Sequence, residues 1–182
     1  IGLGLAVLVY MGAHISGAHY NPAVSLAMLI NKKLSPKELG FYIFSQLLAA
    51  VFATYTLYFL GNDDFSVVSN TSDISQFIVA EILFTFLLVF VILNVALNKT
   101  IEGNQYFGLA IGLTVTAGAF SVGDISGAVF NPAISFGASV YSIVDPEVGS
   151  NALASSDFFI YYLITGVVGA VLASFAYKKI SE

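Results

Sequence analysis

The sequence predicts an all-α membrane protein built as an inverted repeat with two membrane half-helices, and three observations support this prediction. First, 58% of the 182 residues are hydrophobic and 9% are charged, whereas soluble domains carry about 25% charged residues. Second, several apolar segments reach the length of about 20 residues that a helix needs to cross a bilayer. Third, the segment ISGAHYNPAVS at 15–25 returns as ISGAVFNPAIS at 125–135.

The apolar segments define the expected membrane helices in chain order. Residues 1–13 are apolar but too short to span a bilayer, so we expect the chain to begin inside a transmembrane helix. Segments that are long enough to span follow at 41–60, 77–97 and 158–177. A fourth segment, 106–122, is shorter but still usable as a span.

Two more helices are expected to enter the membrane without crossing it, one from Asn21 and one from Asn131. In each copy of the repeated segment an asparagine precedes a proline, and these residues are favoured at the N-cap and first position of a helix. The apolar runs that follow are too short to span. The residues before each asparagine are expected to be extended backbone, which the membrane interior tolerates only where protein covers it or water reaches it.

The spacing of the two copies predicts opposite orientations for them. They are 110 residues apart and agree at eight of eleven positions. The segments 41–60, 77–97 and 106–122 lie between them, and this odd number of crossings makes the copies enter from opposite faces. Inverted repeats of this kind place paired sites near the bilayer midplane. We therefore expect one transmembrane domain over 1–182, with 1–60 as the remainder of the first repeat and 74–182 as the second.

The charged residues predict the orientation of the chain in the membrane. All six basic residues are lysines, and they share one side if the helices alternate in direction: Lys32, Lys33, Lys37, Lys99, Lys178 and Lys179. The opposite side receives acidic residues and no lysine: Asp63, Asp64, Asp73, Asp124, Asp145, Glu147 and Asp157. Because connections rich in lysine stay in the cytoplasm, we expect the C-terminus there.

The composition also argues against several classes of function. The chain has no basic patch and no phosphate-binding glycine loop, so we expect no nucleic-acid or nucleotide partner. It has no cysteine, and no metal-ligand cluster or nucleophile–base set stands out. We therefore expect no enzymatic activity, no cofactor and no bound metal. The lipid bilayer and permeating molecules are the expected partners.

With its two Asn-Pro-Ala motifs, the chain resembles the aquaporin and glycerol-facilitator superfamily of channels over essentially all of its residues. The motifs are Asn21-Pro22-Ala23 and Asn131-Pro132-Ala133. The resemblance implies a single passive channel domain, assembled as a homotetramer with a pore in each subunit, and a place in the plasma membrane. Compared with the six helices of the family, the first helix is missing from this chain, so we expect an aquaporin-like fold without it.

The resemblance also assigns pore-lining and bracing residues. Asn21 and Asn131 are expected both to cap their helices and to line the pore. The neighbouring loop backbone forms the rest of the lining: Gly17, Ala18, His19, Gly127, Val129 and Phe130. Residues that match loop braces are His14, Gln46 and Glu81. Gly2 and Gly112 match a pair of glycines at a close helix crossing.

Three of these assignments leave alternatives open. A lone intramembrane acid such as Glu81 is by default a functional group, so an ion-path carboxylate is the alternative to a brace. For His14 and His19, a buried, hydrogen-bonded histidine and a pH gate are equally open, because the unperturbed imidazole titrates at about pH 6.5.

The outer constriction departs from the family pattern. Water channels of the family follow the second motif with arginine, whereas this chain has Ile134 there and no arginine anywhere. The other three positions of the ring match Ile1, Ala119 and Ala128. The resemblance thus implies an unusually wide and apolar constriction that passes water, small neutral solutes, or both.

Other functions remain open on the same residues. The protein is alternatively a glycerol, urea or ammonia facilitator, although Tyr161 and Tyr162 match an aromatic pair typical of the water-channel branch. An apolar constriction also closes a pore when it expels water, so a poorly conducting structural member of the fold is a further alternative. Secondary transporters share inverted repeats, but they usually need acids at the midplane, where this chain offers only Glu81.

Overall fold

The computed structural model describes residues 1–61, 73–144 and 156–181, and every regular element within these residues is helical. This confirms the all-α class predicted from the sequence. The elements are α1 (Gly2–Ser16), α2 (Pro22–Ile30), α3 (Pro36–Phe59), α4 (Ile74–Leu97), the 3₁₀ turn η1 (Lys99–Ile101), α5 (Phe107–Ser126), α6 (Pro132–Val144) and α7 (Ser156–Ser181). Four of the acidic residues used to predict orientation lie outside the described residues: Asp63, Asp64, Asp145 and Glu147.

Four described helices are long and apolar enough to cross a membrane, namely α3, α4, α5 and most of α7. Each overlaps one of the four predicted spans and is longer than that span. Helix α3 begins at Pro36 because the Ser35 hydroxyl accepts from Glu38 N at 3.3 Å and the Glu38 carboxylate accepts from Ser35 N at 2.8 Å. This reciprocal capping box starts the helix in a polar segment that a count of apolar residues overlooks.

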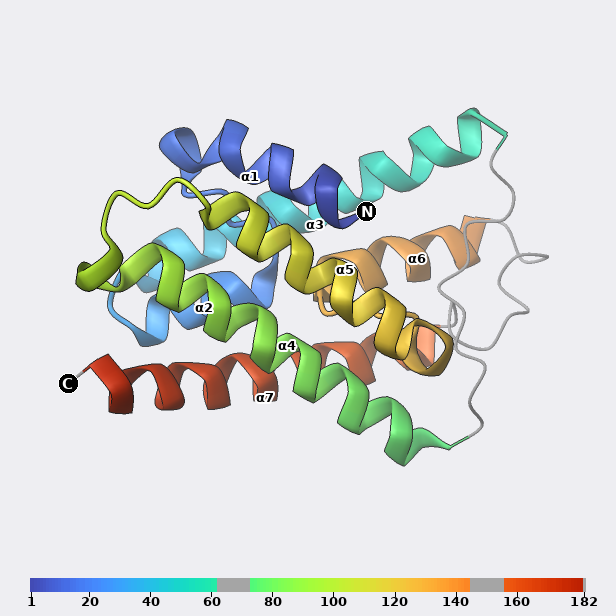
Figure 1. The fold of residues 1–182 in the computed structure, drawn as a ribbon. Coiled ribbons are helices and arrows are strands. Elements are labelled where there is room, and N and C mark those ends of the chain that lie inside the picture. The colour runs from blue at the N-terminus through green and yellow to red at the C-terminus, as the bar shows by residue number, and fades with distance from the viewer. Residues whose placement is uncertain (62–72, 145–155, 182) are drawn as a thin grey trace.

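The two short helices lie where the sequence predicts half-helices. Helix α2 has nine residues and α6 has thirteen, and each carries its proline at the first helical position. Their N-termini face each other in the middle of the molecule, and their C-termini point to opposite ends (Figure 1). Neither helix is long enough to span a bilayer.

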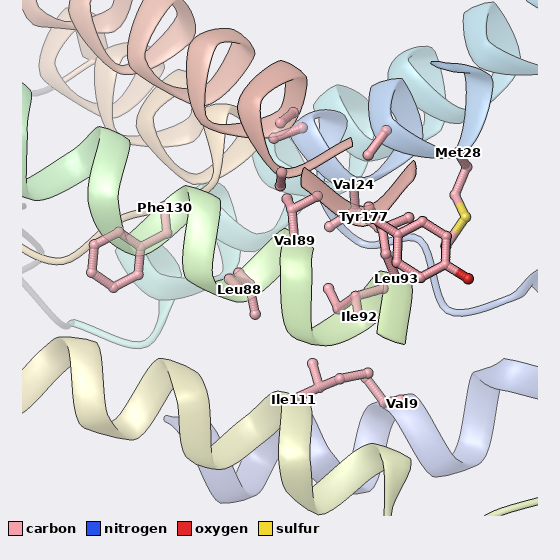
Figure 2. Close-up of a cluster of buried hydrophobic side chains, with 14 residues drawn as sticks. Val9, Val24, Met28, Leu88, Val89, Ile92, Leu93, Ile111, Phe130 and Tyr177 are labelled. Atoms are coloured by element: carbon pink, nitrogen blue, oxygen red, sulfur yellow. The ribbon is translucent and has the colours of Figure 1, made fainter. Parts of the chain in front are cut away.

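The core forms where α4 packs against α5 and α7. Leu88, Val89, Ile92 and Leu93 of α4 are almost completely buried. Figure 2 shows them surrounded by side chains from α1, α2, α5 and α7. Helix α4 is therefore the central support on which the second half of the molecule is assembled.

The outer surface of the helices is apolar, as expected for a protein that faces lipid. Phe44 and Phe52 of α3 are each 66% exposed, and Phe120 of α5 is 90% exposed. A soluble monomer rarely leaves so many large apolar side chains in contact with water. The hydrophobic excess of the sequence thus lies largely on the outside.

Helices α1 and α5 cross at the two glycines that the resemblance identified. A Cβ atom added at Gly112 would overlap the carbonyl oxygen of Gly2 and lie 2.8 Å from the Ala6 Cβ. A Cβ atom added at Gly2 would overlap the Thr116 hydroxyl and the Gly112 carbonyl oxygen. The absence of side chains at these two positions therefore sets how closely the two backbones approach.

Replacing Gly112 by alanine is expected to destabilise the protein by about 1–3 kcal/mol, because overpacking forces the crossing apart. Gly123, on the same helix, offers a matched control, since a Cβ atom added there meets nothing within 4 Å. Gly123→Ala is expected to be neutral or slightly stabilising, because alanine favours the helix over glycine. Thermal unfolding of the two purified variants in detergent measures the difference, and equal melting temperatures would contradict the crossing.

Candidate functional site

Helices α1 and α5 end in the same unusual turn, and each turn leads into a half-helix. Gly17 and Ala18 follow α1 with φ angles of 69° and 54°, and Gly127 and Ala128 follow α5 with φ angles of 78° and 51°. Two consecutive left-handed residues reverse the chain, and glycine at the first position avoids the steric cost of a side chain there. The chain then runs back toward the centre of the molecule through a first loop (17–20) and a second loop (127–130).

Each loop ends in an asparagine that caps the following half-helix. The Asn21 side-chain oxygen accepts from Ala23 N at 2.8 Å, and the Asn131 side-chain oxygen accepts from Ala133 N at 3.0 Å. These bonds satisfy one of the backbone donors that every helix leaves free at its N-terminus. Capping also holds each side-chain amide nitrogen on the side away from its own helix.

The two asparagines also bind each other's loop. Asn21 Nδ2 donates to the Phe130 carbonyl oxygen at 2.7 Å, and Asn131 Nδ2 donates to the Tyr20 carbonyl oxygen at 3.1 Å. This reciprocal pair joins segments about 110 positions apart in the chain and holds the two half-helix N-termini together. Since an amide nitrogen carries two hydrogens, each asparagine keeps one N–H beyond its bond to the opposite loop.

Glu81 of α4 holds the second loop. Its carboxylate is 1% exposed and accepts from the Ser126 hydroxyl at 2.6 Å, from Val129 N at 3.1 Å and from Phe130 N at 2.9 Å. These contacts leave the carboxylate engaged with the loop and away from the open cavity described below. The geometry is therefore that of a brace, which satisfies backbone donors that the reversed chain cannot pair within itself.

Gln46 of α3 holds the first loop. Its side-chain nitrogen donates to the His19 carbonyl oxygen and, at 2.9 Å, to the Ser25 hydroxyl. The His19 ring is partly buried and lies 4.8 Å from the Tyr42 ring. A bracing role for His14 finds no support, because its side chain is exposed in the last turn of α1 and no hydrogen bond described for this part of the chain involves it.

A cavity of about 860 Å³ contains both asparagines. It lies along α1, α2, α4 and α5 and extends to the α4–α5 connection, where Lys99 and Glu102 are exposed. Hydrogen-bonding side chains line it from the middle of the molecule to this connection: Tyr20, Asn21, Lys33, Asn98, Lys99, Glu102, Asn104 and Asn131.

The opposite end of the cavity is aliphatic. Ile134 lies three residues beyond Asn131, and Ile1 and Val115 stand next to Gly2 and Thr116, which contact each other. Ile134 is 42% exposed, so it presents a branched apolar surface where a charged or hydrogen-bonding group would bind a polar molecule.

The expected constriction is therefore only half present in the cavity wall. Ile1 and Ile134 line the cavity, whereas Ala119 and Ala128 do not. Ala128 packs against the core cluster. Ala119 is half-buried on α5.

Of the six loop residues expected to line the pore, three line the cavity. Gly17, Ala18 and Val129 line the cavity, whereas His19, Gly127 and Phe130 do not. The Phe130 ring is buried in the core, where it stacks on Phe84 at 5.5 Å between ring centroids.

Two tyrosines that sequence reasoning did not connect with the loops contact them. Tyr42 of α3 donates to the Ser16 carbonyl oxygen at 2.6 Å, and Tyr162 of α7 donates to the Ser126 carbonyl oxygen at 2.5 Å. The available signal was the four-residue spacing of Tyr42 and Gln46, which places both on one face of a helix. Tyr162 was recognised only as part of an aromatic pair.

Comparisons with known proteins give a consistent result. Residues 1–177 match the family model described as Major intrinsic protein. Aquaporin NIP1-1 of Zea mays is 36% identical over 182 residues, which cover 98% of this chain and 60% of that protein. Aquaporin AqpM of Methanothermobacter thermautotrophicus is 31% identical over 189 residues, which cover 100% of this chain and 74% of that protein.

A solved structure has the same fold. The X-ray structure of the aquaglyceroporin from Plasmodium falciparum superimposes with a TM-score of 0.82 at 26% sequence identity. The similarity covers 98% of this chain and 79% of that one. The chain thus spans most of the solved structure and about 60% of the length of the maize relative.

Replacing Glu81 by alanine is expected to destabilise the protein strongly, because Val129 N and Phe130 N lose their acceptor inside the protein. Each buried unsatisfied donor costs about 1–3 kcal/mol. Glu102→Ala provides the control, since Glu102 is an exposed carboxylate in the α4–α5 connection. Melting temperatures in detergent are expected to fall for the Glu81 variant alone, and a similar loss in both variants would argue against the brace.

Proposed function

Because the chain belongs to the major intrinsic protein family, we propose that it forms a passive channel for water and small neutral solutes, and not an enzyme. The chain is a multi-pass integral membrane protein with four apolar helices of spanning length among its described residues. The observation that carries the proposal is the cavity in which Asn21 and Asn131 meet. Relatives described as aquaporin and aquaglyceroporin support the same class of function.

The centre of the cavity favours neutral molecules with a hydrogen-bond acceptor. Asn21 and Asn131 each hold one amide hydrogen on the opposite loop and have a second one to offer to a solute oxygen. The N-termini of α2 and α6 meet at the same point, and each contributes a partial positive charge. A water molecule gains a donor there, whereas a cation is repelled.

The aliphatic end governs which neutral molecules pass. Ile134 and Ile1 supply no charge and no hydrogen bond, and the chain has no arginine to replace them. Discrimination at this end therefore rests on size and on the cost of removing water from the solute. This supports a weakly selective pathway that admits solutes such as glycerol, urea and ammonia together with water.

A poorly conducting member of the fold is the competing proposal, and the same residues favour it. An aliphatic constriction narrow enough to expel water blocks permeation without any moving part. The two proposals differ in a measurable way, because expulsion of water abolishes water and solute permeation together. A secondary transporter is less well supported, since Glu81 is engaged with the loop backbone.

Orientation and assembly form part of the proposal. The lysines lie at the end of the molecule that holds the C-terminus, where α2 ends, α3 begins and α4 joins α5 (Figure 1). We place this end in the cytoplasm, by the preference of lysine for cytoplasmic connections. The resemblance to the family supports placing the protein in the plasma membrane. We further propose a homotetramer with a pathway in each subunit, whose exposed apolar faces contact lipid or neighbouring subunits.

Proteoliposomes that contain the protein are expected to show faster water, glycerol and urea flux than empty liposomes in stopped-flow light scattering. Ile134→Arg is expected to keep water flux and to reduce glycerol flux by about tenfold or more, because it narrows the aliphatic end and adds a charged donor. Ile134→Val is the matched control and is expected to resemble the unmodified protein. Water flux with complete refusal of glycerol and urea would exclude the weakly selective pathway. No flux at all from folded protein would favour the poorly conducting member.

The orientation is testable with single cysteines, because the chain has none of its own. Asp124→Cys, near the outer end of α5, is expected to react with an impermeant maleimide on intact cells. Ser181→Cys, at the end of α7, is expected to react only after the cells are permeabilised. The reverse pattern would place the C-terminus outside.

A further inference from the structure

Tyr42 and Tyr162 occupy equivalent places in the two halves of the molecule. Tyr42 lies on α3, the helix that follows the first half-helix, and Tyr162 lies on α7, the helix that follows the second. Each phenol donates to the carbonyl oxygen of the last residue of the helix that leads into a loop. Tyr42 binds Ser16 at the end of α1 at 2.6 Å, and Tyr162 binds Ser126 at the end of α5 at 2.5 Å. Both contacts therefore act immediately before the left-handed turn that starts a loop.

These bonds have a clear physical role. The last carbonyl groups of a helix have no partner within it, and water does not reach them freely inside a membrane protein. A hydroxyl that binds such a carbonyl fixes the peptide plane between the serine and the following glycine. The direction in which the loop leaves the helix is then fixed as well.

The two loops differ in what else holds them. The second loop has Tyr162 from α7 and, independently, Glu81 from α4, which accepts from Val129 N and Phe130 N of the loop and from the Ser126 hydroxyl just before it. The first loop is held by Tyr42 and Gln46, which lie one turn apart on α3, so both of these supports come from one helix. Its own Tyr20 phenol also donates to the Leu8 carbonyl oxygen of α1 at 3.1 Å. The Tyr42 ring also lies against the His19 ring within that loop.

We propose that Tyr42 and Tyr162 are positioning residues for the pore loops, and that the first loop depends on its tyrosine more than the second does. The permeation test of this proposal rests on the channel function proposed above, whereas the hydrogen-exchange test does not. The path from Tyr42 to the cavity is short, because Gly17, Ala18 and Tyr20 line it and the Tyr20 carbonyl oxygen binds Asn131. Release of Ser16 therefore alters the position of the donor at the centre.

Phenylalanine variants remove the hydroxyl and keep the ring. Loss of one hydrogen bond changes the equilibrium between the loop position that the tyrosine fixes and other loop positions by about fivefold. In proteoliposomes, Tyr42→Phe is expected to change the ratio of glycerol to water permeability by about fivefold, and Tyr162→Phe by less. Tyr55→Phe and Tyr161→Phe are matched controls on the same two helices, because no hydroxyl hydrogen bond between described residues involves either tyrosine.

Hydrogen exchange measures the same effect without permeation and separates the two proposals. In Tyr42→Phe, amides of 17–20 are expected to exchange about fivefold faster while those of 127–130 keep the unmodified rate. If the unmodified protein conducts nothing, the channel proposal fails, and exchange still decides the positioning role. Unchanged exchange at 17–20 in Tyr42→Phe, or equal acceleration in the Tyr55 control, would overturn it. Circular dichroism melts confirm that each variant is folded.

Discussion

The structure depends on one constraint, which is that backbone polar groups inside a membrane need partners within the protein. Spanning helices meet this constraint alone, but the two reversed loops do not. Their donors and acceptors are satisfied by a small set of side chains from other elements. Asn21 and Asn131 exchange bonds across the centre, Glu81 holds the second loop and Gln46 holds the first. These bonds hold the two loops and the N-termini of the half-helices in place beside the cavity.

The same constraint accounts for the polarity of the cavity. Polar side chains of the loops and connections line one part of it, and aliphatic side chains of α1, α5 and α6 line another. Ile134 belongs to the aliphatic part. The proposed selectivity follows from this order, because a solute meets donors at the centre and only apolar surface beyond it. The residues that brace the loops, Glu81 and Gln46, are thus different from Ile134, to which the proposed solute selectivity is assigned.

Much of the fold was predictable because its signals are local. The length of the apolar segments predicted α3, α4, α5 and α7, and an asparagine followed by proline predicted the starts of α2 and α6. The start of α3 at Pro36 was missed, because a capping box in a polar segment adds helix without adding apolar residues. Resemblance to a family pointed to Glu81 and Gln46. It also assigned His14 a bracing role, but the His14 side chain is exposed, and no hydrogen bond from it to a loop is among those described for this part of the chain.

The sequence by itself determined the membrane class, the helices and the meeting of two half-helices, because length, caps and the repeated motif act over a few residues. Tertiary structure decided which side chains reach the cavity. Of the four residues that match constriction positions, Ile1 and Ile134 line the cavity, whereas Ala119 and Ala128 do not. Tyr42 and Tyr162 reach the loops from helices that follow them, which depends on how α3 and α7 pack. Contacts between distant segments are set by packing geometry, and no local pattern records it.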